Sequence, residues 1–158
     1  MRRAYIFIFL SFFSQGIYSQ VKNTDELYLT AKKLDSLIFN EGFNKCNPSH
    51  YNIIISDDLE FYHDVGGVSK GKEAFIASVK NNICNTPGKV KRELIPNSML
   101  VYPMYNNKTL YGFIQEGTHE FFENTNGKWN KTGQAKFTHL WILENNQWKL
   151  KRVLSYNH

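Results

Sequence analysis

Apolar residues recur at helical spacing in the first half of the chain. The first predicted helix begins at an N-cap, Thr24, and ends near Gly42. Its apolar face carries residues three or four positions apart, namely Leu27, Ala31, Leu34 and Ile38. Asn47-Pro48 predicts the start of a short second helix, and the apolar positions of residues 72–83 predict a third.

The second half of the chain alternates between apolar and polar residues, which is typical of strands with one buried face. The predicted strands are Leu59–Asp64, Lys89–Leu94, Met99–Tyr102, Thr109–Glu123, Ala135–Leu143 and Gln147–Tyr156. The polar stretch from Asn124 to Gly133 is predicted to be a loop. Helices that come first and a meander of strands afterwards predict an α+β fold, with the N-terminal helices packed on a curved antiparallel sheet.

The composition supports one folded domain. The chain has 158 residues, of which 42% are hydrophobic and 21% charged, and these values exclude a disordered or collagen-like chain. A chain of this length buries roughly two-thirds of its unfolded surface, so it needs no metal to fold. The aromatic content of 15% favours a sheet with a concave pocket over a helical bundle.

The first 19 residues have the layout of a secretory signal peptide. Arg2 and Arg3 precede an apolar run, and the small residue Ser19 follows it. The run is too short to span a bilayer, although an uncleaved membrane anchor is the alternative. We therefore predict a signal peptide over 1–19 and a single exported domain, periplasmic or secreted, over 20–158. Loss of the two arginines lowers the net charge from +5 to +3.

The chain has two cysteines, Cys46 and Cys84. An exported chain meets oxidising conditions, and an even number of cysteines then favours a disulfide. We predict a Cys46–Cys84 bond, with two free buried thiols as the alternative.

Several motifs carry a resemblance to a known superfamily. They are Asp57-Asp58-Leu59-Glu60-Phe61-Tyr62-His63, Gly71-Lys72-Glu73-Ala74-Phe75, Phe137-Thr138-His139-Leu140-Trp141 and the final strand from Trp148 to Tyr156. With the order of elements, they make residues 20–158 resemble the nuclear transport factor 2-like superfamily, which includes SnoaL-like and ketosteroid-isomerase-like proteins. The pattern looks most like its exported bacterial branch of domains of unknown function. The resemblance implies a cystatin-like cone with a cavity between sheet and helices, and a homodimer through the outer face of the sheet.

Strand alternation places two arginines on apolar faces. Arg92 lies with Val90 and Leu94, whereas Arg152 shares its face with Trp148, Leu150, Leu154 and Tyr156. A buried guanidinium needs a carboxylate or an anionic ligand, because an unpaired buried charge costs several kcal/mol. Two interpretations stay open for each arginine. One is a contact with a ligand, and the other is a structural ion pair with Asp64, Glu116 or Glu120.

Three histidines fall within predicted strands: His63, His119 and His139. His139 lies between Phe137 and Trp141 on one face, and His119 shares a face with Gln115 and Phe121 if no bulge interrupts the strand at Gly117. Together with Asp64 they offer metal-ligating atoms, but the three strands show no short ligand spacing of the HExxH kind. We predict no metal site.

Acid–base chemistry in the cavity is a further hypothesis, because a carboxylate or imidazole in apolar surroundings has a shifted pKa. Asp64, Glu116 and Tyr156 are candidates for this role, with one of the three histidines as partner, and Asp64 and His139 are the catalytic residues we select. The chain has no nucleophile elbow, phosphate-binding glycine loop or dinucleotide fingerprint, and we predict no cofactor. The predicted pocket residues are His63, Arg92, His119, His139, Trp141, Arg152 and Tyr156.

Two hypotheses of function follow. The preferred one is an exported binding or accessory domain that holds a small organic molecule, with an anion as one class of ligand. The alternative is a small isomerase, dehydratase or hydrolase that uses the same pocket. Four lysines on the strands, Lys89, Lys91, Lys149 and Lys151, are typical of a solvated sheet face. With a mature charge of only +3 and an exported location, we predict no nucleic-acid binding. No other stretch is long or apolar enough to span a bilayer, so we predict no membrane attachment after signal cleavage.

Overall fold

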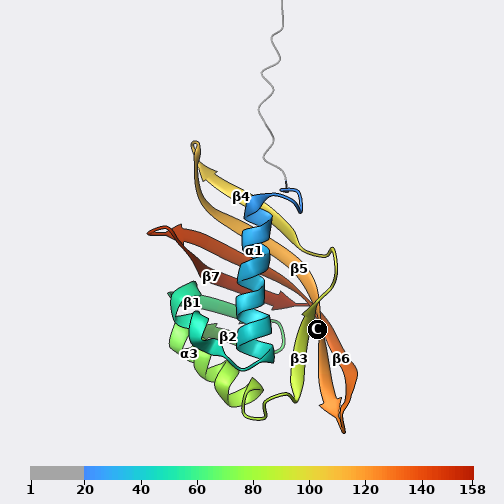
Figure 1. Ribbon diagram of the computed structural model, residues 1–158. Helices are drawn as coiled ribbons and strands as arrows, with labels where there is room; N and C mark the ends of the chain where they lie inside the picture. The colour runs from blue at the N-terminus through green and yellow to red at the C-terminus, as the bar shows by residue number, and fades with distance from the viewer. Residues whose placement is uncertain (1–19) are drawn as a thin grey trace, which may run out of the picture.

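The computed structural model describes residues 20–158, which form three helical segments packed on a curved sheet (Figure 1). The predicted signal peptide, residues 1–19, lies outside the described residues. In Figure 1 the long first helix crosses in front of the sheet, and the other helical segments lie beside its lower end. The predicted α+β class is confirmed, and the helices gather on one face of the sheet.

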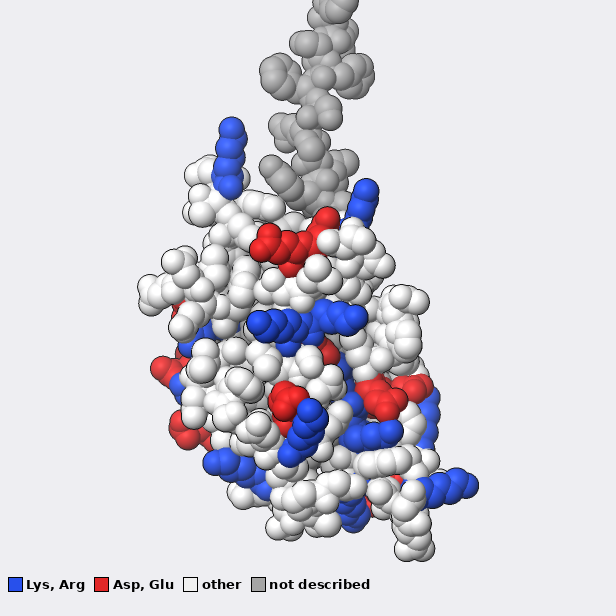
Figure 2. Space-filling model, in the orientation of Figure 1, with Lys and Arg blue, Asp and Glu red and all other residues white. Residues whose placement is uncertain are grey.

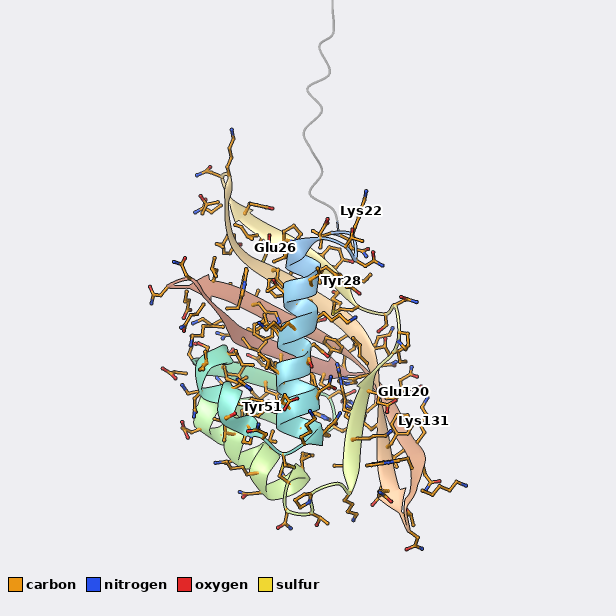
Figure 3. The ribbon with its side chains drawn as sticks, viewed as in Figure 1. Lys22, Glu26, Tyr28, Tyr51, Glu120 and Lys131 are labelled. Carbon is orange, nitrogen blue, oxygen red and sulfur yellow. A yellow bond between two sulfur atoms is a disulfide. The ribbon has the colours of Figure 1, made fainter. Side chains whose placement is uncertain are left out.

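Each helical segment has two parts. The segments are α1 (Glu26–Ser36) with η1 (Leu37–Asn44), η2 (Pro48–His50) with α2 (Tyr51–Ile54), and α3 (Lys72–Ser78) with η3 (Val79–Ile83). Asp25, rather than the predicted Thr24, is the N-cap of α1. Gly42 lets the first two segments approach closely, because a Cβ there would lie 2.1 Å from the Tyr51 hydroxyl. That hydroxyl donates to the Ile38 carbonyl at 2.7 Å, and Figure 3 shows Tyr51 beside the lower end of the first segment.

Within the described residues, seven strands form the sheet. They are β1 (Ile55–His63), β2 (Gly67–Lys70), β3 (Val90–Leu94), β4 (Leu100–Asn106), β5 (Thr109–Thr125), β6 (Lys128–Glu144) and β7 (Gln147–Tyr156). Their order is β2-β1-β7-β6-β5-β3, and β4 also pairs with β5. The long strand β5 therefore pairs with β4 along one half and with β3 along the other.

Two predictions about the sheet are wrong. The sheet is mixed rather than antiparallel, because β1 and β7 run parallel. Alternation within a strand reports which face is buried, but it does not report which strand lies alongside. The predicted loop from Asn124 to Gly133 is instead the far end of the β5–β6 hairpin, which turns at Asn126 and Gly127. Most side chains there are exposed, so the strands show no buried face in the sequence although their backbones pair.

A bulge in β7 reverses the faces of its second half. Against β6, Trp141 pairs with Leu150 but Leu140 pairs with Arg152, so β7 carries one extra residue between them. Leu150 is buried before the bulge, and Val153 and Ser155 are buried after it. Arg152 and every second residue beyond it therefore lie on the outer face.

The core fills the space between the helices and the inner face of the sheet. Ala31, Leu34 and Ile38 from the first helical segment pack with Phe113 and Trp141 from β5 and β6. Each of these side chains is at most 7% exposed. Within residues 20–158, no helix has the length and apolar character needed to cross a membrane.

Cys46 and Cys84 form the predicted disulfide, with their Cα atoms 5.5 Å apart. Cys46 follows η1 and Cys84 follows η3, so the bond joins the ends of two helical segments. Both segments also contribute side chains to the cavity described below.

Candidate functional site

A cavity of about 360 Å³ lies between the helical segments and the inner face of the sheet. Aromatic and aliphatic side chains form most of its wall: Ile38, Phe39, Phe43, Tyr51, Phe61, Phe75, Val79, Ile83, Val90, Phe121, Phe122, Phe137, Leu150 and Val153. The polar side chains of the wall are His63, Ser78, Asn82, His119, Thr132, His139, Ser155 and His158. No lysine, arginine, aspartate or glutamate is among the described residues of the wall. The cavity therefore suits an apolar molecule with a few polar groups.

Arg92 lies behind the cavity wall and pairs with Asp35 of α1. Its guanidinium donates to the two Asp35 oxygens at 2.7 and 2.9 Å, and both residues are at least 95% buried. The same guanidinium lies over the Phe39 ring at 3.8 Å. Arg92 is thus inward-facing and ion-paired, but its partner is Asp35 rather than Asp64, Glu116 or Glu120.

The Asp35–Arg92 pair and its burial shift the two pKa values in opposite directions. Burial raises the pKa of Asp35, and the charge of Arg92 works to lower it. Burial likewise lowers the pKa of Arg92, and Asp35 works to raise it. The two-point hydrogen-bonded geometry favours the ionised pair, because each charge satisfies the other where water does not reach.

His119 of β5 accepts a third hydrogen bond from Arg92. Arg92 Nε donates to His119 Nδ1 at 2.9 Å, so Nδ1 carries a lone pair and the neutral ring carries its hydrogen on Nε2. Burial lowers the pKa of His119 to about 3, with the Arg92 charge as the next cause. His119 is therefore neutral at physiological pH.

His139 of β6 is the second buried histidine of the wall and is 1% exposed. Its Nδ1 lies 3.3 Å from Gln115 Oε1, which also accepts the Trp141 indole N–H at 2.9 Å. Burial holds the pKa of His139 well below its ordinary value, and Arg92 and His119 add to this. Trp141 itself lies in the core beneath His139 and is not part of the cavity wall.

At one end of the cavity, His63 of β1 stacks on His158 with ring centroids 4.2 Å apart. His158 Nδ1 lies 2.6 Å from the Asp64 carboxylate, which also accepts the backbone N–H of Asn157. Burial works to raise the pKa of Asp64, but the hydrogen bonds from His158 and Asn157 outweigh it and lower the pKa. Burial lowers the pKa of His63. Asp64 is not part of the described wall, so the structure does not bring it together with His139.

His63, Asp64 and His158 bring potential metal-ligating atoms within 4.8 Å of one another. His63 Nδ1, however, already accepts the backbone N–H groups of Val65 and Gly66 at 3.2 and 3.0 Å. The two imidazoles are also stacked face to face, whereas ligands of one ion direct their ring edges at it. Hydrogen bonding and stacking account for this cluster without an ion.

Arg152 and Tyr156 do not face the cavity, so this part of the predicted pocket is wrong. The β7 bulge turns both side chains to the outer face, where Arg152 Nε lies 2.9 Å from Glu60. Tyr156 is 38% exposed. Strict alternation across the strand predicted the opposite faces, and one inserted residue is enough to exchange them.

Several wall residues were not predicted from the sequence. Phe39 and Phe43 fall in the π-helical η1, where the spacing departs from the 3.6-residue period. His158 follows the last strand and reaches the wall through Asp64 and Ser155. The aromatic excess indicated a pocket, but it did not assign particular aromatic residues to the wall.

We expect the free energy of unfolding to fall as the pH drops from about 6.5 towards 3. Buried His119 and His139 have lowered pKa values in the folded state, whereas the unfolded chain binds protons near the ordinary histidine pKa of about 6.5. The native state thus holds fewer protons, and each histidine contributes up to about 1.4 kcal/mol per pH unit in this window. Urea unfolding at pH 7.5 and pH 5.0 measures the difference. His139→Phe should flatten the slope, and equal unfolding midpoints at both pH values in the parent would contradict the assignment.

No known protein-family model matches the chain, and neither does any curated protein. Solved structures do resemble it. Aln2 from a Streptomyces species has a TM-score of 0.67 at 10% identity, over 85% of this chain and 92% of that one. An NTF2-like protein from Cytophaga hutchinsonii has a TM-score of 0.62 at 13% identity, over 85% and 99%.

A third similar structure is described as having a cystatin-like fold. It is an NTF2-like protein with a cystatin-like fold from Novosphingobium aromaticivorans, with a TM-score of 0.59 at 12% identity, over 85% of this chain and 90% of that one. At such identities the likeness concerns the fold rather than the chemistry. The curved sheet with helices on one face, together with these likenesses, confirms that the chain has the nuclear transport factor 2-like, or cystatin-like, fold.

Proposed function

We propose that the chain is an exported binding or accessory domain whose cavity holds a small, largely apolar and uncharged organic molecule. The observation that carries the proposal is the wall of the 360 Å³ cavity, which is mostly aromatic and aliphatic and has no lysine, arginine, aspartate or glutamate among its described residues. Burial lowers the pKa of its two inner histidines, His119 and His139, which keeps both rings neutral at neutral pH. An anion held by arginines has no support from this geometry. Arg92 is neutralised by Asp35, and Arg152 lies on the outer face.

A pair of dyes tests the proposal: uncharged N-phenyl-1-naphthylamine and its anionic 8-sulfonate, which share one aromatic body. We expect the uncharged dye to bind with a rise in fluorescence and the sulfonate to bind at least about tenfold more weakly, because an unpaired buried charge costs several kcal/mol. Ser78→Phe places a ring at the wall and should block binding, whereas Ser49→Phe, outside the wall, should not. No binding of the uncharged dye, or tighter binding of the sulfonate, would contradict the proposal.

Export is supported by the signal-peptide pattern of residues 1–19 and by the Cys46–Cys84 disulfide, since such bonds persist in oxidising compartments. Figure 2 shows lysine and arginine interspersed with acidic residues over the helical face, without one continuous basic surface there. N-terminal sequencing of the protein from a bacterial periplasm or culture medium checks export. The expected first residue is Gln20, and retention of Met1 would contradict cleavage.

The enzyme hypothesis keeps one candidate base, His139 Nε2. Burial holds the pKa of His139 well below its ordinary value, which makes it a weak base at neutral pH. The other candidate, Asp64, lies outside the described cavity wall and binds His158 and Asn157. The geometry therefore favours binding over acid–base turnover.

We also propose a homodimer through the outer face of the sheet. Tyr62, Leu154 and Tyr156 are 38 to 44% exposed on this face, and Tyr62 pairs with Leu154 across β1 and β7. Leu154→Glu places a charge in this apolar patch, and we expect it to convert a dimer into a monomer. Light scattering after size exclusion measures the mass, with Ile53→Glu on α2 as the control. A parent protein that is already monomeric at high concentration would refute the dimer.

A further inference from the structure

Two histidines of the cavity wall carry opposite tautomers, and each tautomer is determined by a residue that can only donate: Arg92 directly for His119, and Trp141 through Gln115 for His139. Arginine is always a donor, so the bond from Arg92 Nε leaves the His119 hydrogen on Nε2. Arg92 cannot turn away, because Asp35 holds both of its terminal nitrogens and Phe39 covers its face. His119 Nε2–H therefore points away from Arg92 as a fixed donor.

His139 has the other tautomer. The Trp141 indole is only a donor, so the Gln115 atom that it meets at 2.9 Å is the amide oxygen. The same oxygen faces His139 Nδ1, which must then donate its hydrogen to it. His139 Nε2 consequently carries a lone pair and is an acceptor.

Neither of these outer nitrogens has a protein partner in the described part of the chain. His119 Nε2 is buried without a hydrogen-bond partner among residues 20–158, and the ring is 3% exposed. No hydrogen bond from the same residues reaches His139 Nε2 either. A buried donor without an acceptor is unfavourable, and a bound acceptor would remove this penalty.

An aromatic surface separates the donor from the acceptor. The Phe137 ring lies 5.2 Å from the His119 ring and 4.5 Å from the His139 ring. Phe39 approaches the same two histidines at 5.8 and 6.1 Å. A flat apolar body that packs against Phe137 would therefore lie between one donor and one acceptor.

We propose that the ligand is an uncharged molecule with a flat apolar body, a carbonyl-type oxygen that accepts from His119 Nε2–H and a hydroxyl that donates to His139 Nε2. This inference rests on the proposed function, because it specifies the chemistry of the molecule in the same cavity. Asp35 and Arg92 act as positioning residues that hold the His119 tautomer.

Three tricyclic probes separate the two polar contacts: fluorene, 9-fluorenone with a carbonyl, and 2-hydroxyfluorene with a hydroxyl. We expect the ketone and the phenol each to bind about 3- to 10-fold more tightly than fluorene, as one net hydrogen bond gives. His119→Phe should abolish the preference for the ketone and keep that for the phenol. His139→Phe should do the reverse, so each variant is the matched control of the other.

A second measurement needs no variant. In protein with ¹⁵N-labelled histidine, 9-fluorenone should move the His119 Nε2–H resonance downfield, and fluorene should not. Fluorene that binds as tightly as both derivatives, with no such shift, would overturn the inference and leave the proposed function standing. Failure of the whole series from naphthalene through fluorene to pyrene to bind would instead count against the proposed function itself.

Discussion

Replacement of Arg92 by alanine should lower the free energy of unfolding by about 3–5 kcal/mol, because it leaves the Asp35 carboxylate buried without its counter-charge. A loss of this size is a large part of the total stability of a domain, which is about 5–15 kcal/mol. Urea unfolding followed by tryptophan fluorescence measures it. Asp35→Ala should lower the free energy of unfolding by a similar amount, because it leaves the Arg92 guanidinium buried without a counter-charge.

Arg152→Ala is the matched control for Arg92→Ala. Arg152 also pairs with a carboxylate, Glu60, but its side chain is 34% exposed on the outer face. An exposed ion pair contributes about 1 kcal/mol or less. The double variant Asp35→Leu/Arg92→Leu should recover much of the stability. Two apolar side chains in place of the ion pair leave no buried charge without a partner. Equal losses for Arg92→Ala and Arg152→Ala would contradict this account.

Reduction of the Cys46–Cys84 bond should lower the free energy of unfolding by about 4 kcal/mol, as chain entropy predicts for a closed loop of this length. The bond spans 38 residues and joins the ends of η1 and η3. Its loss frees the two segments that form one side of the cavity, so binding of N-phenyl-1-naphthylamine should weaken as well.

Urea unfolding with and without dithiothreitol measures the effect of the disulfide. The variant Cys46→Ser/Cys84→Ser is the control, because it should show the same lower stability under both conditions. An unchanged unfolding midpoint of the parent after reduction, with free thiols verified by mass, would refute the prediction.

The sequence predicted the placement of the two central histidines but not the network around them. On β5 and β6 no bulge interrupts the strand from Phe113 to His119 or from Ala135 to Trp141, and every second residue is buried, so the inward faces were correct. The partners of these histidines come from other elements. Asp35 lies 57 positions before Arg92 on a helix, and its position on the buried helix face gave no signal of a partner on β3.

The last strand shows the opposite outcome. Its pattern predicted Arg152 and Tyr156 on the cavity side, and the bulge between Leu150 and Arg152 places them outside. The extra residue of this bulge is not of a type that marks bulges in a sequence. The apolar–polar alternation therefore continues across the bulge, although the residues after it face the opposite side of the sheet. The hydrophobic pattern alone therefore assigned half of this strand to the wrong face.

By itself the sequence determined the α+β class, the likeness to a cystatin-like cone, the pairing of the two cysteines and the inward faces of β5 and β6. The α+β class and the inward faces follow from local periodicity, the cone from the resemblance of the motifs to a known superfamily, and the cysteine pairing from the presence of only two cysteines. Only the tertiary structure decided that Asp35 neutralises Arg92, that Arg152 lies outside and that His119 and His139 carry opposite tautomers. These features depend on which distant segments meet, because a hydrogen bond or ion pair is set by atoms in space rather than by their order along the chain.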